Sequence, residues 1–248
     1  MDEHELKDIG KKIIDYCNKF FIPPEYLFEI LEDQKVTPMI RGKAMEFNAF
    51  LLLEATLDKH VWSVQKLNLN AQTGVGDEDV SLTHRRSGVI LKVESKSAVR
   101  GSISAGTRSR LKIPHFKVKC HRSRSNIKLA DTSNDRYAVD CFDVIITNTL
   151  NAIYEGNTVS ENLGLVPDVA TRKILYSHYH CSNEIEVIRA CADDWRYTIP
   201  QDIAENGYVP RTPYVQLDND PHWRPVSEIE SRLLQVVASK RNAQTRRS

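Results

Sequence analysis

The sequence predicts an α/β (α+β) protein with a central mixed sheet flanked by helices, preceded by N-terminal helices and followed by a C-terminal loop and helix extension. Three observations predict this class. Apolar residues recur at helical spacing over residues 5–20 and 38–59, two extended runs flank a turn within residues 80–93, and residues 136–146 have the composition of a buried strand. Helices and strands that alternate in this way pack as layers around a shared core.

The N-terminal part contains three predicted helices. The first covers residues 5–20 and ends before two consecutive prolines, and a short helix follows through Glu32. Thr37 is a good N-cap and Pro38 suits the first helical position, so a long helix is expected from there to about Lys59.

Strand signals follow this helix. Ser87 and Gly88 form the predicted turn of a hairpin between the two extended runs. The other segments with strand-like composition are residues 61–64, 116–120, 136–146 and 173–177.

The last part of the chain alternates between loops and a helix. Residues 199–223 contain four prolines, which predicts an ordered layer of loops. A capping box at Ser227 to Glu230 opens a final helix, and residues 240–248 form a basic tail. The expected organisation is a single domain over residues 1–248, with a helical segment at 1–36, a core at 37–195 and a C-terminal extension at 196–248.

Several function classes find no support. No stretch of about 18 apolar residues exists and the acidic N-terminus has no apolar segment, so neither a membrane span nor a signal peptide is predicted and a cytoplasmic location is expected. The five cysteines are scattered, which indicates reduced thiols, and they match no zinc-binding spacing. The GxxxxGK[ST] and GxSxG motifs are absent, so no nucleotide cofactor and no serine hydrolase is predicted.

The stretch from Gly76 to Lys96 is the most informative. The end of one hairpin strand lies near the beginning of its partner, so Asp79 and Glu94 are expected side by side. The two-residue period of a strand places Glu94 and Lys96 on one face and Ser95 on the other. Two carboxylates and an ammonium at one point suit a hard divalent cation and the hydrolysis of a phosphodiester. The alternative is a solvated turn before an amphipathic strand end.

Glu46 is a carboxylate on an otherwise apolar stripe of the long predicted helix. Burying an unpaired carboxylate is unfavourable, so Glu46 should have a partner or bind a cation. The sequence leaves open whether it joins the same site, extends to solvent at the edge of the stripe, or pairs with Arg41 or Lys43.

A formal net charge of +1 conceals a basic segment. Between His84 and Lys128 the only acidic residue is Glu94. A solvated face is the ordinary explanation for a charge run, but phosphate binding better explains so long a segment with one acid. In the segment after Lys96, the leading candidates for base contacts are Arg108, Arg110, Arg122 and Arg124, with phosphate contacts as the equal alternative. The residues expected to bind nucleic acid are Arg85, Arg86, Arg100, Arg108, Arg110, Lys112, Lys117, Lys119, Arg122 and Arg124.

These residues resemble the PD-(D/E)xK nuclease signature, in which an acidic residue is followed after a variable gap by Glu-x-Lys. The run from Arg41 to Glu46 is similar to the helix that often precedes this signature, from which a Glu commonly joins the metal site. The resemblance covers about residues 41–144. The proline that often precedes the first Asp is missing, so Asp77 and Asp79 both remain candidates, and Asp79 is favoured because a strand-like run follows it directly.

The resemblance implies a restriction-endonuclease-like fold and Mg²⁺-dependent hydrolysis of double-stranded DNA. Asp79 or Asp77, Glu94 and Glu46 would hold the cation, and Lys96 would orient or help deprotonate the attacking water. A small chain without helicase or ATPase motifs suits a type II restriction endonuclease, commonly a two-fold homodimer on a palindromic site. The alternatives are a repair or structure-specific nuclease and a non-catalytic DNA-binding protein.

Overall fold

The computed structural model describes residues 2–33, 35–66, 79–107, 111–121, 135–154 and 168–245. The chain divides into two compact units, Met1–Ala44 and Met45–Ser248, which are described separately below.

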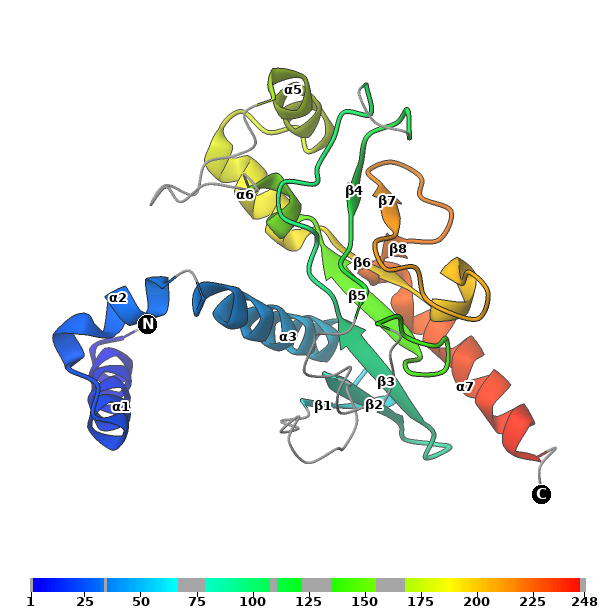
Figure 1. Cartoon of the computed structure of the whole chain (residues 1–248). Coiled ribbons are helices and arrows are strands. Elements are labelled where there is room, and N and C mark those ends of the chain that lie inside the picture. The colour runs from blue at the N-terminus through cyan, green and yellow to red at the C-terminus, as the bar shows by residue number, and fades with distance from the viewer. Residues whose placement is uncertain are drawn as a thin grey trace. The chain divides into compact units, whose positions relative to one another are not determined.

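The first unit is helical (Figure 1). Helix α1, Glu3–Phe20, begins two residues before the predicted start, because Asp2 and Glu5 form a capping box with N···O distances of 2.7 and 2.8 Å. It ends at Phe21, whose φ of 55° is left-handed. The 3₁₀ helix η1 (Pro24–Tyr26), helix α2 (Leu27–Glu32) and the start of helix α3 (Thr37–Thr56) follow.

The second unit is built on a mixed sheet, which confirms the predicted fold class. The described residues form six strands in the order β1-β2-β3-β5-β6-β8, in which only β3 and β5 are parallel neighbours. The strands are β1 (Trp62–Lys66), β2 (Val80–His84), β3 (Ile90–Ser95), β5 (Val144–Asn148), β6 (Trp195–Thr198) and β8 (Arg224–Pro225).

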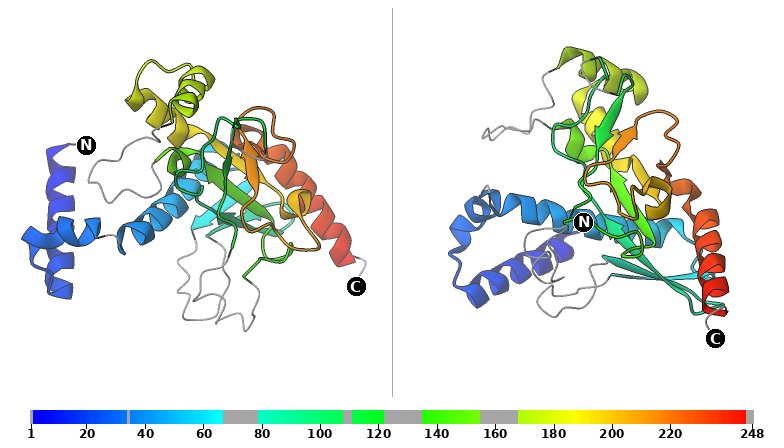
Figure 2. Two further views of the ribbon diagram at one scale, coloured as in Figure 1. Left: turned by 45° about the horizontal axis from the view of Figure 1, so that its top comes forward. Right: turned by 45° about the vertical axis from the view of Figure 1, so that its right-hand side comes forward.

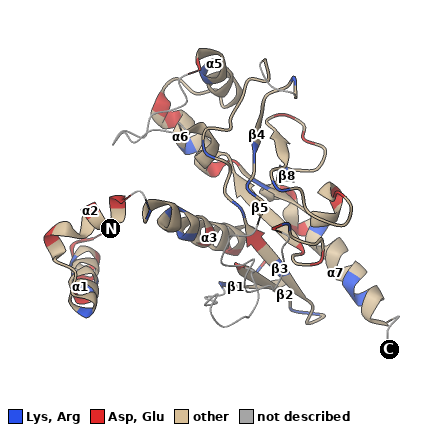
Figure 3. Ribbon diagram, viewed as in Figure 1, with Lys and Arg blue, Asp and Glu red and all other residues tan. Residues whose placement is uncertain are grey.

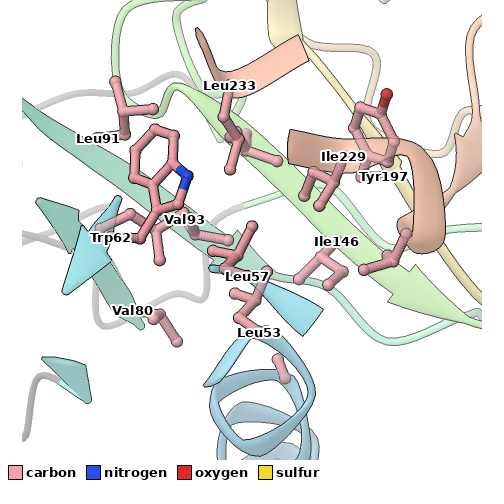
Figure 4. Close-up of a cluster of buried hydrophobic side chains, with 14 of the residues drawn as sticks. Leu53, Leu57, Trp62, Val80, Leu91, Val93, Ile146, Tyr197, Ile229 and Leu233 are labelled. Atoms are coloured by element: carbon pink, nitrogen blue, oxygen red, sulfur yellow. The ribbon is translucent and has the colours of Figure 1, made fainter. Parts of the chain in front are cut away.

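Helices cover the two faces of this sheet. Successive residues of β5 enter different cores: Ile146 packs with α3 and α7, whereas Ile145 packs with α5 and α6. Figure 4 shows the first core, where Leu53 of α3 and Leu233 of α7 approach Val93 of β3. The helical elements of this unit besides α3 are η3 (Leu150–Ile153), α5 (Val169–His178), α6 (Glu184–Asp193), η4 (Pro200–Ile203), η5 (Val226–Glu228) and α7 (Ile229–Thr245).

A second, two-stranded sheet belongs to the α5 and α6 side. It pairs β4 (His115–Lys117) with β7 (Tyr214–Gln216) in antiparallel register, and Figure 2 shows the two strands side by side. Phe116 and Val215 are fully buried and join the second core.

Two strand predictions were wrong. Residues 173–177 lie in helix α5, because Asp168 accepts hydrogen bonds from the amide and hydroxyl of Thr171 at 2.8 and 2.6 Å and so caps a helix. The strand predicted at 136–146 begins only at Val144, because the chain turns where Cys141 N donates to Ala138 O at 3.1 Å.

Residues 196–245 are continuous with the core. They supply β8, helix α7 and all but the first residue of β6, and Ile229 and Leu233 of α7 are fully buried. Among the described residues, no helix combines the length and the apolar character that crossing a bilayer requires.

Candidate active site

The register of the β2–β3 hairpin sets the backbone positions of its two acidic residues. Val80 is paired with Val93, so Asp79 lies beside Glu94, and Asp79 N donates to Val93 O at 3.1 Å. Gly88 forms the turn with a φ of +69°. The hairpin geometry therefore places both carboxylates at the same end of the sheet.

Glu94 and Lys96 interact on one face of β3. Lys96 Nζ donates to Glu94 Oε1, and the ammonium lies over the ring of Tyr137 at 4.6 Å from its centroid. Both charged side chains are buried, with exposed fractions of 6% for Glu94 and 14% for Lys96. Burial alone would lower the pKa of Lys96, but the Glu94 carboxylate and Tyr137 raise it above its ordinary value.

The opposite face presents Ser95, which holds Asp79. Asp79 Oδ2 accepts a hydrogen bond from Ser95 N at 2.8 Å and another from Ser95 Oγ at 2.6 Å. The middle residue of Glu-x-Lys had no predicted role. The structure shows that it fixes the orientation of the neighbouring carboxylate.

Glu46 projects from α3 toward Lys66, the last residue of β1. Lys66 Nζ donates to Glu46 Oε2 at 2.9 Å and to the backbone oxygen of Asp79 at 3.3 Å. The exposed fractions are 15% for Glu46 and 9% for Lys66. Lys66 is not among the residues predicted for the site, because the predicted strand ends at Val64. Strand β1 continues for two more residues and pairs Lys66 with Val80.

The electrostatics at Asp79 reflect this crowding. Burial raises the pKa of Asp79 above its ordinary value and the nearby Glu46 carboxylate raises it further, while the hydrogen bonds from Ser95 and the charge of Lys96 oppose the shift. A cation between the carboxylates of Asp79 and Glu46 would offset the cost of burying their charges and would reduce the repulsion between them.

The fit to a metal ion rests on donor chemistry. Asp79, Glu94 and Glu46 supply carboxylate oxygens, the donors that a hard divalent cation prefers. Within the described ranges, however, no group of three His, Cys, Asp or Glu side chains has a metal-binding arrangement. Asp77, the alternative ligand, lies outside the described residues.

Cys120 lies within electrostatic range of Lys96 and Glu94. Burial raises the pKa of its thiol to about 12. Burial therefore favours the protonated thiol over the thiolate, which is the reactive and metal-binding form.

Two of the expected DNA-binding lysines lie close to this site. The chain after Lys96 runs alongside β4 and the residues that follow it: Val99 N donates to Lys117 O at 2.7 Å, and Lys119 N donates to Ser97 O at 3.0 Å. The acidic tip of β3 and the basic residue of β4 are both visible in Figure 3.

Among the described candidates, two arginines lie away from this site. Arg85 and Arg86 follow β2 at the turn, which is the opposite end of the hairpin from Asp79, and Arg85 Nε donates to the backbone oxygens of Lys59 and Trp62. Arg100 lies over the ring of Tyr154 at 6.0 Å, and Lys112 is exposed before β4. Four arginines lie outside the described residues: Arg108, Arg110, Arg122 and Arg124.

Comparisons with known proteins leave the family open. No family model matches the sequence, and no curated protein is significantly similar to it. Among solved structures, a bacterial homing endonuclease, I-Ssp6803I, aligns at 20% sequence identity with a TM-score of 0.27. The alignment covers 44% of this chain and 60% of that one.

Proposed function

We propose that this protein is a Mg²⁺-dependent endonuclease that hydrolyses phosphodiester bonds of double-stranded DNA. The observation that carries the proposal is the convergence of Asp79, Glu94 and Lys96 at one end of a hairpin, in the order and spacing that the PD-(D/E)xK resemblance implies. Glu46 reaches the same end from helix α3.

Asp79, Glu94 and Glu46 are the residues that would hold the cation. When bound, Mg²⁺ supplies Lewis-acid polarisation of the scissile phosphate and lowers the pKa of a coordinated water. Ser95 keeps Asp79 oriented, and Lys66 pairs with Glu46 until the cation takes its place. The Lys96 ammonium would orient the attacking water and stabilise the negative charge that develops on the phosphate.

DNA binding would use the basic residues nearest the site. Lys117 and Lys119 belong to the segment that runs beside the chain following Lys96, so both are suited to contact the backbone phosphates. We propose that cleavage is sequence-specific, as in a type II restriction endonuclease, and that the active form is a two-fold homodimer.

A non-catalytic DNA-binding protein is the second candidate, and one observation favours it. Each glutamate of the site is already bound by a lysine, Glu94 by Lys96 and Glu46 by Lys66. If these pairs persisted in the presence of a cation, the protein would keep its basic surface and lack the chemistry.

Incubation with long duplex DNA separates these functions. The purified chain is mixed with phage DNA in Mg²⁺, in Ca²⁺ and in a chelator, beside a branched-junction substrate. Discrete fragments that require Mg²⁺ and disappear in the Asp79→Asn variant support a sequence-specific endonuclease. Cutting restricted to the branched substrate indicates a repair nuclease instead, and a mobility shift without any cutting indicates a binding protein.

A further inference from the structure

The first unit has very little core of its own. Among its described residues, 2–33 and 35–44, only Cys17 and Leu27 are buried. Helical units of this size bury too little apolar surface to be stable unless another surface covers them. The unit therefore needs a partner for its apolar side chains.

Helix α1 presents the surface to be covered. Leu6, Ile9, Ile13, Tyr16 and Phe20 recur at alternating spacings of three and four residues, which places them on one face of the helix. Their exposed fractions lie between 39% and 54%. This spacing is typical of a helix that packs lengthwise against another helix.

The charges beside this stripe are complementary to a second copy of α1. Glu5, Lys12 and Lys19 follow one edge of the stripe at intervals of seven residues. In an antiparallel pair centred near Lys12, Glu5 of each copy meets Lys19 of the other. Lys12 meets its own counterpart, but its charge is already compensated by Asp8 at 2.5 Å.

The two halves of the helix carry opposite charge. Four acidic residues and one lysine occupy residues 2–8, whereas three lysines and one acidic residue occupy residues 11–19. A parallel pair would place like charges side by side, and an antiparallel pair places opposite charges together. Acids and lysines are almost equally numerous, which disfavours an anionic membrane surface, because helices that bind such surfaces carry an excess of Lys and Arg.

We propose that the first unit is a homodimerisation module in which α1 pairs antiparallel with α1 of a second copy. The inference deepens the proposed endonuclease function, since a two-fold dimer would present two active sites to a symmetric target. It rests only on residues of the first unit. Dimerisation is measured without DNA or metal, so its failure and a failure of the nuclease proposal are distinguishable.

The mass of the full chain in solution tests the module. Light scattering after size exclusion should give twice the 28.3 kDa of one chain. Ile13→Glu places a charge in the stripe and should raise the dimer dissociation constant at least about tenfold. Lys11→Glu, on the opposite side of α1, introduces the same side chain and should leave the dimer intact.

Two outcomes would overturn the module. One is a wild-type chain that remains at the mass of a single copy up to high micromolar concentration, whether or not it binds anionic vesicles. The other is an Ile13→Glu chain that dimerises as tightly as Lys11→Glu. Circular dichroism of both variants, with wild-type helix content as the requirement, excludes unfolding as the cause of a difference.

Charge complementation tests the orientation. Glu5→Lys and Lys19→Glu should each weaken self-association several-fold, because each creates two like-charged contacts in an antiparallel homodimer. An equimolar mixture of the two variant chains should form a heterodimer with near wild-type affinity, since both contacts again join opposite charges. A mixture that associates no better than the separate variants would exclude the antiparallel arrangement.

Discussion

Ser95 donates two hydrogen bonds to the same carboxylate oxygen of Asp79, from its amide at 2.8 Å and from its hydroxyl at 2.6 Å. The amide bond comes from the backbone and survives any substitution that preserves the strand. The hydroxyl bond depends on the side chain, so the contribution of Ser95 to the orientation of Asp79 can be removed alone.

Ser95→Ala should therefore slow cleavage without preventing DNA binding. Loss of one hydrogen bond to a carboxylate should reduce the single-turnover rate about tenfold, which corresponds to roughly 1.4 kcal/mol. Ser95→Thr retains the hydroxyl and serves as the matched control. An unchanged rate for Ser95→Ala at saturating protein and Mg²⁺ would mean that the backbone amide alone orients Asp79.

Removal of either member of the Glu94–Lys96 pair should stop cleavage and also destabilise the fold. Both side chains are buried, so Glu94→Gln or Lys96→Met leaves an uncompensated charge, which costs about 3–5 kcal/mol. The double variant removes both charges and should recover most of that stability while remaining inactive. Urea unfolding and cleavage of the three variants check this, and equal stability of the double and single variants would contradict it.

Substitutions of Glu46 and Lys66 should have coupled effects on cation binding. If Lys66 acts by holding Glu46, Lys66→Met should tighten binding of Mn²⁺, used as a Mg²⁺ substitute, because the carboxylate is released for the cation. In a Glu46→Gln background, Lys66→Met should then have no further effect. Calorimetric titration of the four proteins completes the cycle. An equal effect of Lys66→Met in both backgrounds would show that Lys66 acts independently of Glu46.

The sequence predicted the positions that follow from strand period and hairpin pairing, and it did not predict the pair between Glu46 and Lys66. The period of a strand was sufficient to place Glu94 and Lys96 on one face, and the hairpin was sufficient to bring Asp79 beside Glu94. Lys66 could not be found in this way, because its approach to Glu46 depends on the length and register of β1.

The errors in the fold have related causes. The sequence of α5 contains strand-forming residues, and its helical state depends on the cap at Asp168. The late start of β5 depends on a turn at Ala138 and Cys141 and on the packing of the Tyr137 and Phe142 rings, whose centroids are 4.8 Å apart. Caps and turns of this kind outweigh the strand propensity of the residues beside them.

Asp194 should contribute stability that depends on pH. Burial alone would raise its pKa, but hydrogen bonds from Arg196, Thr149 and Tyr179 hold the pKa below its ordinary value. A depressed folded-state pKa gives stability that is fully present above the unfolded-state value, about 4, and is lost as the pH falls through the folded-state value. Asp194→Asn should lower stability by about 1–3 kcal/mol at pH 7.

Measurement of urea unfolding between pH 7 and pH 2.5 checks this sign. The difference in free energy of unfolding between the wild-type chain and Asp194→Asn should become smaller below about pH 4, where the wild-type carboxyl gains its proton. Asp193→Asn is the control, since Asp193 is exposed. A difference that stays constant over the range would show that the charge of Asp194 does not contribute.

Lys119 should contact DNA phosphates, whereas Arg86 should not. Lys119 is exposed and its amide donates to Ser97 O, next to Lys96, while Arg86 lies at the far end of the hairpin. Lys119→Ala should weaken binding of all duplex sequences equally and reduce the slope of log affinity against log salt by about 1. Arg86→Ala should leave both quantities unchanged. Titration of both variants in Ca²⁺ at several salt concentrations measures the slope. If Arg86→Ala lowers the slope and Lys119→Ala does not, the DNA lies across the turn between β2 and β3, and Lys119 faces solvent.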